Sequence, residues 1–173
     1  MNKKLIDPLE IEANFPIVTL VSHNNKVISW LIRVFSRGSY NHVCWLHKPR
    51  VVASQDGSYK IRLLYDYMRV GYKLKFYKLI DITPVQRKLL LATINKKLEK
   101  GVVKSRYDVL GIFGQLTGLR FINNPLTNYC SESVGNDIRK IFGDIRKYPT
   151  PEDIDNYCGD HPNFEYLGHW IGS

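Results

Sequence analysis

Cysteine is scarce in this sequence, and the number is odd. The 173 residues include three cysteines, Cys44, Cys130 and Cys158. A small secreted domain stapled by disulfides usually has a larger and even set, so at least one thiol here stays reduced. We therefore expect a protein of a reducing compartment that has a thiol available for chemistry.

Long apolar runs, linkers and repeats are also lacking. No window approaches the roughly 20 apolar residues that cross a bilayer. Acidic residues at Asp7, Glu10 and Glu12 come before any apolar run long enough for a signal peptide. No stretch rich in Pro, Gly or Ser divides the chain, so we expect one domain over residues 1–173, cytoplasmic or virion-associated, without a transmembrane segment.

Acidic residues are in the minority. Lys and Arg number 25 against 16 Asp and Glu, which gives a formal net charge of +9. A basic protein attracts polyanions. A nucleic-acid-binding surface, however, needs its Lys and Arg side chains clustered on one face, and here these residues are scattered along the chain from Lys3 to Lys147. An ordinary solvated surface and a surface for nucleic acid or phospholipid head groups are both compatible with this pattern.

Apolar periodicity predicts an α+β domain. Alternating or β-branched runs predict strands at Phe15–Val21, Tyr40–His47, Val51–Gln55, Tyr59–Leu64 and Tyr72–Leu79, the last with one wet face. Apolar spacing and capping signals predict helices at Val27–Phe35, from Thr83 to about Lys100, at Tyr107–Leu116, and from about Tyr129 to Phe142. A further cap at Thr150 precedes an irregular aromatic tail. We expect an antiparallel sheet packed against these helices.

Cys130 is the candidate nucleophile. It opens a predicted helix, where unsatisfied backbone N–H groups and the helix dipole favour a thiolate and could also hold an oxyanion. Its neighbours Tyr129, Ser131, Glu132 and Ser133 are largely polar. The other reading is a small buried apolar side chain, as most unpaired cysteines are.

His42 is the candidate base. It opens a predicted strand, so its ring can project from the sheet toward a packed helix. A structural histidine is the alternative. Cys44 and His47 lie nearby, but no second cluster with metal-ligand spacing accompanies them, so we expect neither a metal nor a cofactor.

These motifs resemble a known family. The stretch ISWLIRVFSRGSYNHVCWL, then YDVLGIFGQLTG followed by NYCSESV, is similar to the circularly permuted NlpC-like branch of the papain-like cysteine hydrolases, which includes YiiX-like and lecithin:retinol acyltransferase-like proteins. In that branch the histidine precedes the cysteine, as here. The resemblance runs from about Phe15 to Asp153 and implies a permuted papain-like fold with Cys130 and His42 as catalytic pair.

The resemblance also implies an orienting residue for the histidine on the next strand, within Val51–Gln55. Counting from His42 points to Ser54, whereas the apolar pattern points to Ala53, which cannot serve. Gln55 is chemically better suited, because its carbonyl can accept the imidazole N–H. A dyad without a third residue is the remaining option. Tyr107 matches the family tyrosine whose hydroxyl helps to stabilise the oxyanion.

The function expected from this resemblance is cysteine-dependent hydrolysis of an amide or ester, or acyl transfer, through a thioester. Peptides, cell-wall peptides and lipid acyl groups are all candidate substrates, and the basic charge suits an anionic one. A second hypothesis is a binding or virion structural module with the same fold and little activity. Contact with nucleic acid, in a viral or phage protein, is a third, and affinity that falls steeply with salt would favour it.

Overall fold

The computed structural model describes residues 4–11, 15–23, 38–56, 58–100 and 130–172. The elements, in chain order, are η1 (Pro8–Glu10), β1 (Ile17–Ser22), β2 (His42–Lys48), β3 (Val51–Asp56), β4 (Ser58–Leu63), η2 (Leu64–Tyr67), β5 (Lys73–Leu79), α2 (Pro84–Glu99), α4 (Cys130–Phe142), α5 (Pro151–Asp160) and β6 (Phe164–Ile171). The predicted helices Val27–Phe35 and Tyr107–Leu116 lie outside the described residues.

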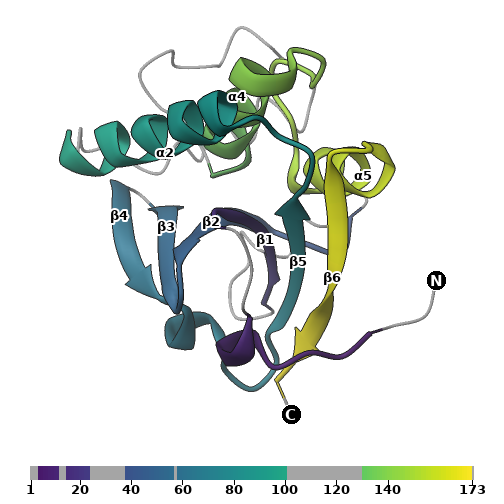
Figure 1. Cartoon of the computed structure of the whole chain (residues 1–173). Coiled ribbons are helices and arrows are strands. Elements are labelled where there is room, and N and C mark those ends of the chain that lie inside the picture. The colour runs from purple at the N-terminus through teal and green to yellow at the C-terminus, as the bar shows by residue number, and fades with distance from the viewer. Residues whose placement is uncertain (1–3, 12–14, 24–37, 57, 101–129, 173) are drawn as a thin grey trace, which may run out of the picture.

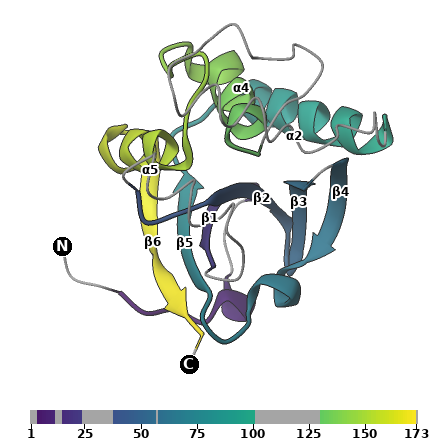
Figure 2. The same cartoon turned by 180° about the vertical axis from the view of Figure 1, so that it is seen from behind.

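The strands form one six-stranded sheet in the order β4-β3-β2-β1-β5-β6. Each neighbouring pair is antiparallel. The sheet is strongly curved, and α2, α4 and α5 gather at one side of it (Figures 1 and 2). The prediction of an α+β domain with an antiparallel sheet packed against helices is therefore confirmed.

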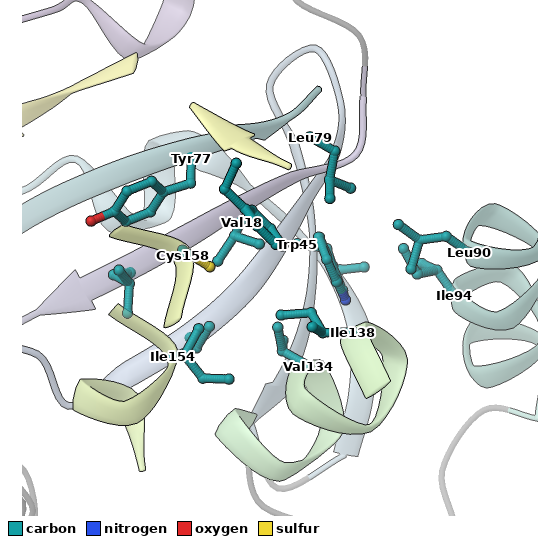
Figure 3. Packing of buried hydrophobic residues seen from close by; sticks show 14 of the residues in the cluster. Val18, Trp45, Tyr77, Leu79, Leu90, Ile94, Val134, Ile138, Ile154 and Cys158 are labelled. Atoms are coloured by element: carbon teal, nitrogen blue, oxygen red, sulfur yellow. The ribbon is translucent and has the colours of Figure 1, made fainter. Parts of the chain in front are cut away.

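Two apolar cores lie on the two faces of the sheet. The helix-side core joins sheet residues such as Val18 and Trp45 to Ile94 of α2, Ile138 of α4 and Ile154 of α5, as Figure 3 shows. The second core lies on the other face and includes Ile17, Val21, Cys44, Leu46, Val52, Leu64, Leu74 and Phe76. Because successive side chains of a strand alternate between faces, the strands β1, β2, β3 and β5 each supply both cores.

Capping residues set the helix starts that the sequence predicts. The Thr83 side chain accepts a hydrogen bond from the Gln86 N–H, and the Gln86 side chain accepts one from the Thr83 N–H. Thr150 and Asp153 form the same reciprocal arrangement at α5. Such boxes satisfy backbone donors that a helix start leaves unpaired. No helix among the described residues is long and apolar enough to cross a membrane.

The chain after α5 is regular, contrary to the prediction of an irregular tail. It forms β6, which pairs with β5 along its length. Cys158 belongs to α5 and is 1% exposed. The face expected to be solvent-exposed in Tyr72–Leu79 is covered only in part. Lys73 is exposed, but Lys75 pairs with Asp155 of α5 at 2.7 Å and Tyr77 is 1% exposed.

Candidate functional site

His42 and Ser54 meet in the sheet. Nε2 of His42 lies 2.8 Å from Oγ of Ser54, a buried hydrogen bond between the start of β2 and the neighbouring strand β3. His42 is 8% exposed and Ser54 is fully buried. The Ser54 hydroxyl can accept the Nε2 proton or donate to that nitrogen, so it fixes the ring in either state.

Strand alternation decides which residue of β3 reaches the imidazole. Cys44 and Val52 belong to the second core, so His42 and Ser54, each two residues away along its strand, share that face. Ala53 belongs to the helix-side core on the opposite face. Gln55 adjoins Ser54 and therefore projects to the opposite face as well. The structure brings Ser54 to His42, and of the three candidates only Ser54 has this position.

An aromatic ring covers the imidazole. Tyr67 of η2 stacks on His42 with ring centroids 6.0 Å apart and planes inclined by 9°. Tyr67 packs against the second core. The His42 ring is thus held at one edge by Ser54 and over one face by Tyr67. These contacts restrict rotation of the ring, which a base needs in order to keep one nitrogen pointed at its proton donor.

Cys130 is the first residue of α4 and is 7% exposed. Its backbone N–H belongs to the first turn, where N–H groups have no acceptor within the helix. Burial raises the pKa of the Cys44 thiol, and an electrostatic interaction with Cys130 raises it further. Cys44 lies on the same face of β2 as His42, two residues along the strand.

A buried carboxylate fixes α4 against the sheet. Asp137 lies two turns along α4 from Cys130, and its side chain is fully buried. One of its oxygens accepts a hydrogen bond from Nε1 of Trp45 in β2 at 3.0 Å. The other lies 2.6 Å from Nζ of Lys97 in α2. This Asp137 clamp joins α4, β2 and α2, and thereby sets the position of Cys130 relative to β2.

The Lys97 ammonium contributes further bonds to the clamp. It donates to the carbonyl oxygen and to the hydroxyl of Ser133, each at 2.9 Å, and it lies over the Tyr59 ring at 5.3 Å. Burial lowers the pKa of Lys97 and raises that of Asp137, because the hydration that each charge loses outweighs the attraction of its partner. Burial therefore disfavours both charges of the clamp, and their attraction offsets part of that cost.

The sequence did not point to the clamp. Trp45 reads as an ordinary core aromatic and Asp137 as one more polar residue of an amphipathic helix. A signal does exist in retrospect: Asp137 follows Cys130 by seven residues and precedes Ile138, so it lies on the buried side of α4. A carboxylate on such a face requires a buried partner.

The remaining predicted residues do not complete a larger cluster. Tyr107, expected near the oxyanion, lies outside the described residues. Among the residues that the structure describes, no group of three or more His, Cys, Asp or Glu side chains could hold a metal ion. Cys44 and His47, three residues apart on β2, project to opposite faces of the strand. His42 and Ser54, with Cys130 at the start of α4, are the candidate site.

No protein-family model matches this chain, and no curated protein matches it.

Proposed function

We propose that this protein is a cysteine hydrolase or acyltransferase with a permuted papain-like fold. The observation that carries the proposal is the buried His42–Ser54 hydrogen bond of 2.8 Å on adjacent strands. The helix α4, which begins with Cys130, packs on the same strand β2 through the Trp45–Asp137 hydrogen bond. A nucleophile, a base and a residue that orients the base are the parts that thiol catalysis needs. Their order along the chain, histidine before cysteine, supports the permuted branch.

In the proposed reaction, His42 takes the proton of the Cys130 thiol. Because Nε2 is engaged with Ser54, Nδ1 is the nitrogen that accepts this proton. The thiolate attacks the carbonyl carbon of the substrate and forms a tetrahedral oxyanion. Backbone N–H groups in the first turn of α4, Cys130 included, are suited to stabilise that charge, because they have no acceptor within the helix.

The tetrahedral species then collapses to a thioester. His42 returns its proton to the departing amine or alcohol, and the acyl group stays on Cys130. A water molecule, or another acceptor, gives its proton to His42 and attacks the thioester. The acid or the new acyl product is released and the thiol is restored. Amides and esters of peptides or lipids are the substrate class that this chemistry accepts.

Ser54 is a weaker orienting residue than a carboxylate would be. A neutral hydroxyl bonded to an imidazole contributes about 1 kcal/mol. Its effect on rate is therefore modest, and Tyr67 stacking supplies part of the same restraint. The proposed enzyme accordingly depends on His42 far more than on Ser54.

Trapping of the acyl-enzyme tests the proposal. The protein is incubated with activated esters of short and long acyl chains, and its intact mass and peptide map are recorded. We expect a thioester on Cys130 in the wild type and none in His42→Ala. Cys158, a buried cysteine of α5, is the internal control. Acylation of Cys130 that is equally fast in His42→Ala would leave only nonspecific thiol reactivity and favour a binding or structural role.

A further inference from the structure

Exposed apolar side chains gather at the end of the sheet farthest from α2 and α4. Figures 1 and 2 show η2, the turn before β5 and the end of β6 together at this end. We name it the distal end. Its exposed apolar side chains are Leu63 (59% exposed), Tyr65 (68%), Val70 (77%) and Ile171 (45%).

Backbone contacts make the distal end one continuous surface. The Leu64 N–H donates to the Arg50 carbonyl at 2.9 Å, which joins η2 to the turn between β2 and β3. The Gly71 N–H donates to the Gly172 carbonyl at 3.2 Å, which joins the turn before β5 to the end of β6. Ile171 is the partner of Lys73 in the β5–β6 ladder.

Val70 projects from the tip of a tight turn. The Tyr72 N–H donates to the Arg69 carbonyl at 3.0 Å and closes the turn, and Gly71 has a φ of +79° that glycine adopts readily. An apolar side chain at such a tip contacts little of its own protein. Arg69 and Lys73 lie on either side of it and are exposed.

Basic side chains surround these apolar tips. Lys48, Arg50, Arg69 and Lys73 are exposed, and none forms an ion pair with a residue that the structure describes. The acidic side chains at this end include two that cap short helices: Asp66 accepts from the Leu63 N–H at 3.3 Å and Asp7 from the Leu9 N–H at 2.8 Å. Glu10 of η1 is exposed.

We propose that the distal end binds the surface of a bilayer that contains anionic phospholipid. Apolar side chains at separate tips can enter the boundary between head groups and acyl chains, while Arg and Lys stay among the phosphates. Nucleic acid offers no apolar layer for these side chains to enter. The proposal is independent of catalysis by Cys130.

Vesicle co-sedimentation of the whole chain tests this surface. Phosphatidylcholine vesicles with and without phosphatidylglycerol are compared at low and high salt. We expect binding to the anionic vesicles only, weakened by salt because exposed charges are screened beyond about 10 Å at 0.1 M. The variant Val70→Ser/Ile171→Ser should bind at least about fivefold more weakly, since it removes apolar area that enters the membrane.

The helix α2 offers a matched control. Val85 and Leu89 are 76% and 47% exposed, nearly the values of Val70 and Ile171, but they lie away from the distal end. Val85→Ser/Leu89→Ser should bind as the wild type does, and circular dichroism checks that both variants are folded. No binding to anionic vesicles would overturn the proposal, as would equal losses in the two variants. The protein could instead bind double-stranded DNA more tightly than vesicles, with no change in Val70→Ser/Ile171→Ser. That result would overturn the proposal and show that the basic side chains of the distal end bind nucleic acid.

Discussion

Removal of the Asp137 carboxylate should destabilise the protein more than most single substitutions do. In Asp137→Ala, the Lys97 ammonium loses its partner at 2.6 Å and the Trp45 indole N–H loses its acceptor at 3.0 Å. The side chain of Lys97 is 25% exposed and that of Asp137 is fully buried. The substitution therefore leaves a charge and a donor behind in a region from which water is largely excluded.

The magnitude follows from these two losses. Breaking a buried ion pair by removing one partner costs about 3–5 kcal/mol, and the lower end applies here because Lys97 reaches water and still donates to Ser133. An unsatisfied indole N–H adds about 1 kcal/mol. Together they come to roughly 4 kcal/mol, a large share of the 5–15 kcal/mol that a domain of this kind has in total.

Urea denaturation followed by circular dichroism measures the effect. Lys97→Met and the double variant Asp137→Leu/Lys97→Met complete the comparison. The double variant should recover much of the loss, because an apolar pair in place of a buried ion pair is often neutral or stabilising. A loss below about 1 kcal/mol in Asp137→Ala would refute the reasoning, since the carboxylate would then not be a buried partner of both groups.

The same site gives a pH dependence with a definite sign. Burial raises the pKa of Asp137 above its ordinary value of 3.8, so the folded state binds this proton more readily than the unfolded state. The stability that the protonated Asp137 contributes is fully present below pH 3.8, the ordinary pKa. It is lost as the pH rises through the raised pKa of the folded state. Wild type should therefore lose stability relative to Asp137→Asn between acid and neutral pH. The opposite trend in melting temperature would contradict this direction.

Other predictions concern single groups. Tyr59→Phe should raise the unfolding free energy by about 1 kcal/mol, because the Tyr59 hydroxyl is buried with no hydrogen-bond partner among the described residues. Burial also raises the pKa of Tyr59, so the wild type should lose stability above pH 10.0 and the variant less; equal alkaline losses would contradict this. Gly135→Ala should cost about 1–3 kcal/mol, as its Cβ would lie 2.4 Å from Cγ of Pro149; an unchanged urea midpoint would exclude the clash. Thr150→Ala should cost about 1 kcal/mol by removing the acceptor of the Asp153 N–H, and a thermal melt identical to wild type would show that the cap is unimportant.

The sequence predicted those elements whose signals are local. Thr83 with Gln86, and Thr150 with Asp153, define helix starts within a few residues of chain, and the structure confirms both. The strand β6 was missed because its register with β5 shifts between Phe76 and Tyr77. That irregularity breaks the alternation of apolar and polar residues by which a strand is recognised.

The candidate site was predictable only in part. Ala53, Ser54 and Gln55 could not be separated from sequence, because a shift of one residue moves a side chain to the other face of a strand. The alternation of β3 between the two cores assigns Ser54 to the face of His42. The pairing of Asp137 with Lys97 could not be predicted at all, since it depends on how two helices pack rather than on either helix alone.

The most direct test of the central claim is the rate at which iodoacetamide alkylates Cys130, mapped by mass spectrometry over a range of pH. We predict that at neutral pH Cys130, which is 7% exposed, reacts faster than Cys44 and Cys158, which are each 1% exposed. Its rate should fall at least about a hundredfold in His42→Ala and roughly fivefold in Ser54→Ala, in proportion to the loss of a base and of one neutral hydrogen bond. Cys130 that is inert, or that reacts equally fast in wild type and His42→Ala, would contradict the claim that the two residues form a catalytic pair.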